Sequence, residues 1–88
     1  YITHRLPDPV MDEARRRFRL VAEPTDQTPA PAELHQGFSQ AEAVICTLNV
    51  TVDAALLAQA ARLKIVANFA VGYNNIDVAA ARARGIIV

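Results

Sequence analysis

The feature that most constrains this chain is a pair of largely apolar segments, residues 43–47 and 63–69, each followed by a stretch with helical spacing. A strand without polar alternation is typical of parallel sheets, because helices cover both faces of such a sheet. Parallel neighbours also need a crossover connection, usually a helix, between them. The two runs therefore predict an α/β fold in which strands and helices alternate.

The rest of the chain fits the same alternation. The sequence predicts strands at residues 1–3, 18–22, 43–47, 63–69 and 86–88. It predicts helices at residues 8–17, 32–38 and 77–84, and a further helix along the stripe of Val52, Leu56, Ala60 and Leu63. The expected architecture is an open parallel sheet with helices on both faces, in the order β-α-β-α-β-α-β-α-β, truncated at the fifth strand.

Several residues mark the expected helix ends. Asp8 is expected to cap the helix at residues 8–17, with Pro9 at its first position. Thr51 and Asp53 offer caps for the third helix, and Gly85 suits the left-handed position that closes the fourth.

Composition excludes several classes of function. Nine basic and nine acidic side chains cancel, so no general field attracts nucleic acid or an anionic membrane. A single cysteine, Cys46, allows no internal disulfide, and two histidines are too few to complete a metal site with it. No apolar run approaches the roughly 18 residues that span a bilayer. We therefore expect one small cytoplasmic domain without metal, nucleic-acid or membrane partners.

The segment at residues 68–77 is the most informative candidate site, because ligands of open α/β sheets bind beyond the carboxyl ends of the strands. It turns at Gly72 and passes Asn74 and Asn75, which tolerate left-handed backbone. Such a turn can aim successive backbone N–H groups outward and form a small anion site. The same residues also suit a plain connection in which Asn75 or Asp77 caps the next helix. The pattern leaves both interpretations open.

The two histidines and the cysteine have structural explanations. His4 follows the first strand and is expected in a surface loop, with a place at a pocket rim as the alternative. His35 lies on a short polar helix. Cys46 lies inside an apolar strand, where cysteine behaves as a small hydrophobe and has no basic neighbour to activate it.

The arginines and the loop tyrosine carry less information. The basic cluster at residues 15–19 lies one turn from acidic side chains and is expected to be a solvated helix end. Arg82 and Arg84 are expected on a solvated helix face, where basic residues near a helix end are favourable. Tyr73 either packs over a ligand or lies on the surface.

Residues 63–88 resemble the D-isomer-specific 2-hydroxyacid dehydrogenases, above all the glyoxylate/hydroxypyruvate reductase branch. The most specific part is the run Val71-Gly72-Tyr73-Asn74-Asn75-Ile76-Asp77, and residues 3–7 and 52–57 also fall where that branch has similar segments. The resemblance implies that residues 1–88 are the N-terminal portion of a substrate-binding, or catalytic, domain with a flavodoxin-like sheet. The chain begins at Tyr1 and stops inside an apolar run, so we expect a fragment.

The resemblance also implies three substrate-binding residues. The backbone N–H groups of Val71 and Gly72 are expected to hold the carboxylate of a 2-oxo acid, and Leu48 to form an apolar wall. Many members carry aspartate where this chain has Asn74, which leaves the hydrogen bonding of the loop open. Phosphite dehydrogenase has a lysine where this chain has Val71, which argues against phosphite as the substrate.

The family passes a hydride from NAD or NADP to a small 2-oxo acid, such as glyoxylate or hydroxypyruvate, and forms a D-2-hydroxy acid. The chain has only three glycines and no G-x-G-x-x-G motif, so the NAD(P)-binding Rossmann domain is expected outside it. The family's catalytic arginine, glutamate and histidine lie beyond Val88. We therefore expect no catalytic, cofactor-binding or metal-binding residue in this chain, no activity of the chain alone, and a homodimeric full-length parent.

A stand-alone flavodoxin-like ligand-binding or regulatory module is the alternative. A phosphoacceptor module needs clustered acids after the first strand and an aspartate ending the third, but the sequence has Arg5-Leu6-Pro7 and Thr47-Leu48 there. An FMN module needs a glycine-rich phosphate loop, and residues 3–9 contain no glycine. A generic ligand-binding half-domain stays open. A Rossmann fingerprint encoded after Val88 favours the enzyme, and a stop codon favours the module.

Overall fold

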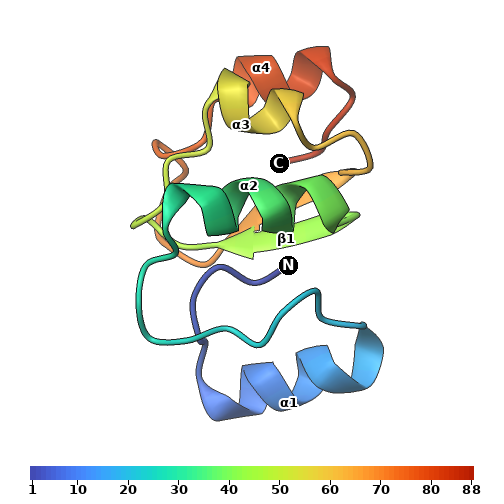
Figure 1. The fold of residues 1–88 in the computed structure, drawn as a ribbon. Helices are drawn as coiled ribbons and strands as arrows, with labels where there is room; N and C mark the ends of the chain where they lie inside the picture. Colours follow the sequence, from blue (N-terminus) through green and yellow to red (C-terminus); the bar gives the residue numbers. More distant parts are fainter.

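Two strands and four helices form the regular part of the computed structural model, which describes residues 1–88 (Figure 1). In chain order they are α1 (Asp8–Arg17), α2 (Pro31–Gln40), β1 (Ala43–Cys46), α3 (Ala54–Ala58), β2 (Ile65–Asn68) and α4 (Val78–Ala83). The two strands pair in parallel, with Ala43 opposite Ile65 and Cys46 opposite Asn68. The α/β class and the parallel pairing are confirmed.

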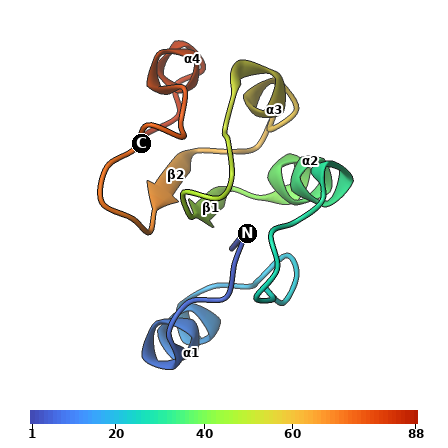
Figure 2. The same cartoon turned by 90° about the vertical axis from the view of Figure 1, so that its left-hand side faces the viewer.

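Single parallel bridges extend this pair on both sides. Ile2 bridges Ile45, and Ile87 bridges Ile65, so the order across the sheet is residue 2, β1, β2 and residue 87 (Figure 2). The Thr3 N–H donates to the Ile45 carbonyl at 3.0 Å. The predicted first and last strands therefore join the parallel sheet, each as one bridge rather than a full strand.

The predicted strand at residues 18–22 is wrong. Phe18 ends α1 in an extended conformation with 63% of its surface exposed, and the residues that follow form bends and coil. A strand is stabilised chiefly by cross-strand pairs, and no bridge joins this segment to another. Its β-prone composition alone does not make a strand.

Helices lie on both faces of the sheet, as predicted. Val44, Cys46 and Val66 point to one face, where they share a buried cluster with residues of α2, α3 and α4. Ile45 alternates to the other face and packs against Met11 and Ala14 of α1. The figures show α1 and the other three helices on opposite sides of β1 (Figures 1 and 2). None of the helices has both the length and the apolar character needed to cross a bilayer.

Coverage of β1 is less complete than predicted. Ala43 is exposed and Ile45 is half-buried, whereas Val44 and Cys46 are buried. Only α1 covers the second face, and a single helix cannot cover a sheet of this width. The expectation of a strand buried on both faces is therefore wrong for half of its residues.

Helix ends agree with the predictions in α3 and α4 but not in α1. The Leu56 N–H donates to the Asp53 carboxylate at 2.9 Å, so Asp53, not Thr51, caps α3. Gly85 adopts φ +74° after α4, and its N–H donates to the Arg82 carbonyl. The predicted bounds of α1 are confirmed, but Asp8 is its first helical residue and not its cap, and Pro7 occupies the cap position without a side-chain hydrogen bond.

The third helix is shorter than its apolar spacing predicted. It ends at Ala58, and Ala60 and Leu63 follow in tight turns that still bury their side chains. Val52 is not helical: it forms a parallel bridge with Ile76. Val52, which the apolar spacing placed at the start of the helix, instead joins the loop that follows β1 to the loop that follows β2.

Candidate functional site

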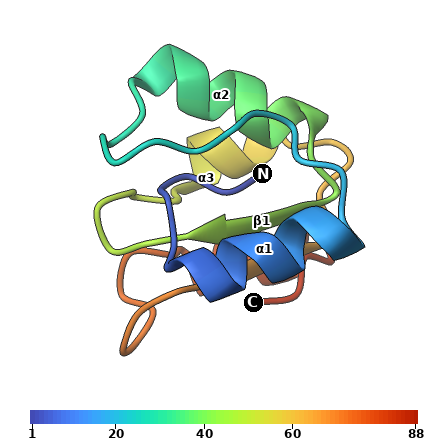
Figure 3. The same cartoon turned by 90° about the horizontal axis from the view of Figure 1, so that it is seen from below.

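The loops after β1 and β2 leave the same edge of the sheet, because parallel strands have their carboxyl ends on one side. Figure 3 shows both loops, yellow-green and orange, at the same end of the molecule. All three predicted substrate-binding residues lie on these loops: Leu48 after β1, and Val71 and Gly72 after β2. The topology therefore brings both predicted loops to one edge, where ligands of open α/β sheets bind.

The predicted residues are open to solvent. Val71 is 98% exposed, and Leu48 is 55% exposed. Gly72 adopts φ +93°, and a Cβ added there would meet no atom within 4 Å. Glycine is thus needed at this position for its backbone conformation alone, not for close packing. Asn74 and Asn75 do not use the left-handed backbone that they tolerate, since no residue other than glycine has a positive φ.

The loop after β2 presents a continuous row of unpaired donors. No backbone N–H from residue 70 to residue 75 donates to a backbone or side-chain acceptor. Neither residues 70–75 nor residues 47–52 carry a charged side chain, and the carboxylates that follow them, Asp77 and Asp53, are helix caps. Any anion at this edge is therefore met by neutral backbone N–H groups, which favour negative charge through their dipoles.

Two asparagine side chains join the two loops. Asn75 Nδ2 donates to the Val50 carbonyl at 2.9 Å and to the Thr47 carbonyl at 3.2 Å. Asn68 Nδ2 donates to Asn75 Oδ1 at 2.9 Å and to the Gly72 carbonyl at 2.8 Å. Asn75 is thus no helix cap; that role belongs to Asp77, which accepts from the Ala80 N–H.

Sequence reasoning missed this pair of amides, which we call the amide bridge (Asn68 and Asn75). Asn68 ends an otherwise apolar strand, and Asn75 lies next to the cap of the following helix. Those two positions were the available signal, because an amide at the end of a buried strand needs polar partners. Their partners are three backbone carbonyls, which the sequence does not identify because every residue has one.

Cys46 lies directly beneath the amide bridge. It is fully buried, and its Sγ donates to Asn68 Oδ1 at 3.4 Å. Burial raises the pKa of the Cys46 thiol to about 11, against a smaller opposite effect from the Asn75 amide. The thiol therefore stays protonated near neutral pH and packs as a small hydrophobe, as predicted.

Both histidines hold parts of the chain together. The His4 ring nitrogens contact the carbonyl oxygens of Arg5 and Asp26 at 2.8 and 2.9 Å, so the ring ties the loop after residue 3 to a distant surface loop. His35 Nδ1 contacts Gln59 Oε1 at 2.9 Å and links α2 to the end of α3. The structural explanation thus accounts for each ring.

The arginines of α1 are paired with nearby acids. Arg16 and Arg17 both contact Glu13 at 2.8 Å, and Arg15 pairs with Glu23 and Asp12. All are exposed, so each pair contributes little to stability. The cluster is a solvated helix end, as predicted. Tyr73 is 60% exposed, and Arg82 and Arg84 are exposed on α4 without an ion-pair partner.

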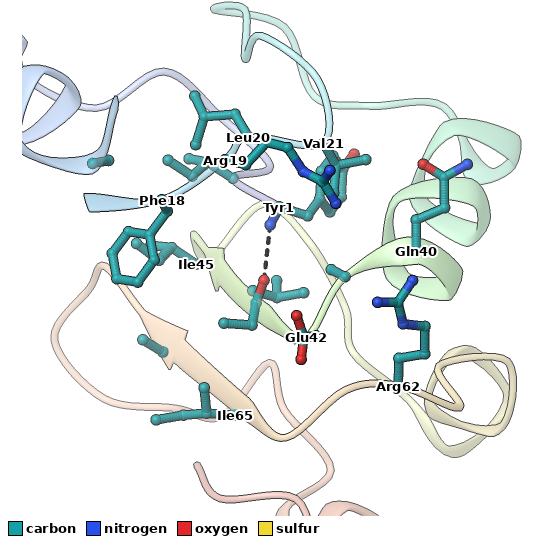
Figure 4. Close-up of a pocket in the computed structure, with 16 residues that line it drawn as sticks. Tyr1, Phe18, Arg19, Leu20, Val21, Gln40, Glu42, Ile45, Arg62 and Ile65 are labelled. Carbon is teal, nitrogen blue, oxygen red and sulfur yellow. Dashed lines mark hydrogen bonds between the residues drawn. The ribbon is translucent and has the colours of Figure 1, made fainter. Parts of the chain in front are cut away.

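A cavity of about 760 Å³ lies away from these loops. Figure 4 shows it at the start of β1, where the Tyr1 amino group donates to the Ala43 carbonyl at 2.8 Å. Twelve of its sixteen lining residues are hydrophobic, among them Phe18, Ile45 and Ile65. It is the part of the sheet face that α1 leaves uncovered. Few polar groups converge on it, and no three metal-ligating side chains meet anywhere in the structure.

The chain as a whole is similar to proteins of known family. All of residues 1–88 match the family model described as D-isomer specific 2-hydroxyacid dehydrogenase, catalytic domain. The chain belongs to this family. The resemblance carried by the Val71-Gly72 segment is therefore confirmed at the level of the family.

Curated relatives of this 2-hydroxyacid dehydrogenase chain include several glyoxylate reductases. The one from Thermococcus gammatolerans is 34% identical over 88 residues, and that from Pyrococcus furiosus is 32% identical. Each match covers the whole chain but only 26% of the relative. The chain thus spans about a quarter of the length of these relatives.

Solved structures agree with the fold. A crystal structure of the TT0316 protein from Thermus thermophilus matches 98% of the chain with a TM-score of 0.86 and 32% identity, over 28% of its own length. An NAD⁺-bound 3-phosphoglycerate dehydrogenase from Entamoeba histolytica matches with a TM-score of 0.75 at 15% identity, which supports the fold alone.

Proposed function

We propose that this chain is the carboxylate-binding portion of an NAD(P)-dependent enzyme that reduces a small 2-oxo acid of the glyoxylate or hydroxypyruvate type to the D-2-hydroxy acid. In this proposal the N–H groups of Val71 and Gly72 hold the substrate carboxylate, and Leu48 forms an apolar wall beside it. The supporting observation is the row of unpaired N–H donors at residues 70–75 in an uncharged loop.

The chemistry of the loop suits this role. A carboxylate bound by two neutral N–H groups loses part of its hydration and gains charge-assisted hydrogen bonds. Fixing the carboxylate also fixes the position of the neighbouring C2 carbonyl, so the loop contributes orientation to the reaction. Because the site has no formal charge of its own, binding depends on how well the backbone is held in place.

The residues of this chain do not fit the pyrophosphate of a dinucleotide. The turn from β1 to α3 contains no glycine, and the turn after β2 contains only Gly72. A close backbone approach to a pyrophosphate needs several glycines in one such turn. We therefore place NAD or NADP on another part of the protein and assign no step of hydride transfer to these residues.

The finer features of the whole protein belong to the same proposal. We infer that the bridges at Ile2 and Ile87 are parts of longer strands in the complete domain, which gives the flavodoxin-like sheet. We also infer a homodimer that works in the cytoplasm. The glyoxylate reductases among the relatives support the substrate class.

The Gly72→Ala variant of the full-length protein tests the site. An L-residue at φ +93° is strained, so the turn will shift and move the N–H groups, although the added Cβ itself has open space. We expect the KM for glyoxylate to rise about tenfold or more, which corresponds to roughly 1.4 kcal/mol.

Gly85→Ala is the matched control. Gly85 also has a positive φ, +74°, and open space around a Cβ, but it lies behind α4. It should lower stability by a similar amount and leave the KM for glyoxylate unchanged. Equal changes of KM in both variants would show that Gly72 acts through stability and not through the substrate.

A further inference from the structure

Beyond the binding loop itself, the amide bridge holds the two loops in a fixed relation. Asn75 donates to two carbonyls of the loop after β1, Thr47 and Val50, while Asn68 donates to the Gly72 carbonyl of the loop after β2. The two amides also bond to each other in both directions, at 2.9 and 3.3 Å. One continuous network thus joins residues on opposite sides of the candidate site.

The carbonyl partners fix the orientation of both amides. A carbonyl oxygen can only accept, so the NH₂ group of each asparagine must face it. Both asparagines are half-buried, and Cys46 closes the network from below. The network is satisfied on its protein side, which makes it rigid.

This network also decides where the backbone donors point. In a trans peptide the C=O and the following N–H point in opposite directions, and the structure has no cis peptide. Holding the carbonyls of Thr47 and Gly72 inward therefore turns the N–H groups of Leu48 and Tyr73 away from the amide bridge. Neither N–H has a protein acceptor.

We propose that Asn75 is a positioning residue that sets the affinity of the site for the substrate carboxylate, because its side-chain amide locks the loop after β1 to the loop after β2. The inference rests on the proposed function of the Val71-Gly72 loop. Asn75 itself does not touch the substrate; it holds the loop that carries Leu48 against the loop that carries Val71 and Gly72.

The test compares Asn75→Ala and Asn74→Ala in the full-length protein. Asn74 is the matched control, since it lies in the same loop, is exposed and makes no side-chain hydrogen bond. We expect Asn75→Ala to raise the KM for glyoxylate about tenfold, because residues 47–50 lose their side-chain ties and must be ordered when substrate binds, while the backbone bridge between Val52 and Ile76 remains. The KM for the nicotinamide cofactor should change less than twofold in both variants, and that for glyoxylate less than twofold in Asn74→Ala.

Two further variants keep the inference testable if Asn75→Ala does not fold. Asn68→Ala releases only the Gly72 carbonyl and should raise the KM for glyoxylate by a smaller factor. Asn75→Asp sets a carboxylate against the carbonyls of Thr47 and Val50, and should raise that KM more than alanine does.

The outcomes separate the two proposals. A wild-type protein that reduces no 2-oxo acid overturns the proposed function and this inference with it. A wild-type protein that is active, with variants that unfold more easily but keep the wild-type KM for glyoxylate, overturns the inference alone. A rise of both KM values by the same factor also overturns it, since a general loss of structure would explain that result.

Discussion

Burial of one small polar atom can make the stability of a whole domain depend on pH, and Cys46 is such a case. The thiol is fully buried, and burial raises its pKa to about 11 from an ordinary value of 9.0. The folded state therefore keeps this proton at pH values where the unfolded chain has already lost it. The protonated Cys46 thiol makes its full contribution to the stability of the fold below pH 9, and this contribution is lost as the pH rises toward 11.

We expect the free energy of unfolding of the protein to fall by roughly 2–3 kcal/mol between pH 9 and pH 11 because of this one residue. Denaturant unfolding at a series of pH values measures the fall. Cys46→Ala is the control, because it removes the thiol and keeps Tyr1, whose phenol pKa burial and Glu33 also raise. If the two proteins lose stability in parallel, Cys46 does not carry the effect.

At the same scale, Asn75 shows what the sequence could not reveal. The sequence predicted a cap at Asn75 or Asp77, and Asp77 is the cap. The partners of Asn75 are carbonyls 25 and 28 positions away along the chain. Every residue has a backbone carbonyl, so no residue type identifies the partners of Asn75. Only the parallel pairing of β1 with β2 brings these carbonyls within reach of its side chain.

Among the elements, the contact between α2 and the first residue is the tightest. Gly37 lies inside α2 and is buried against the ring of Tyr1, which meets Phe38 edge to face with 6.1 Å between ring centroids. A Cβ on Gly37 would overlap ring carbons of Tyr1. A glycine in a helix is ordinarily unfavourable, and here it makes room for an aromatic side chain.

We expect Gly37→Ala to lower the free energy of unfolding by about 1 kcal/mol, since overpacking costs about 1–3 kcal/mol and the better helix propensity of alanine returns up to about 1. In a Tyr1→Ala background the ring is gone, and the same substitution should stabilise by up to about 1 kcal/mol. Urea unfolding of the four proteins measures both effects. The same sign in both backgrounds would contradict the role given to Tyr1.

Elements were predictable where two independent signals agreed. The strands β1 and β2 combine apolar runs with flanking polar residues, and α1 combines prolines, acids and a final arginine cluster. Residues 18–22 had only β-prone side chains, and no neighbouring strand completes them. The apolar spacing after Thr51 predicted too long a helix, because Val52 is held by Ile76 of a distant loop.

At the scale of the whole molecule, we expect these residues to provide binding groups but no group that transfers a proton or a hydride. Cys46 is buried and protonated, and both histidine rings are occupied by carbonyl or amide oxygens. Residues 47–52 and 70–75 carry no charged side chain, and the nearest carboxylates, those of Asp53 and Asp77, cap the two helices that follow. In the proposed function these loops orient an oxo acid, and the acid or base that acts on it belongs to another part of the protein.

We therefore expect the 88-residue chain alone to oxidise no NADH or NADPH in the presence of glyoxylate, while the full-length protein does. The loss of nicotinamide absorbance measures both rates under the same conditions. Amide chemical shifts of Val71 and Gly72 on addition of glyoxylate show whether the short chain is folded and binds. Measurable oxidation by the purified short chain would refute the expectation.

The hydrogen bond from the Tyr1 amino group to the Ala43 carbonyl joins residues 42 positions apart. A ribosome adds roughly 5–20 residues per second, so about 2–8 s of synthesis separate the first residue from its partner. During that time Ile2 and Leu6, both buried in the complete fold, have no strand to pack against. Residues 1–6 therefore stay unprotected until β1 has been synthesised, and a chaperone can bind them during that interval.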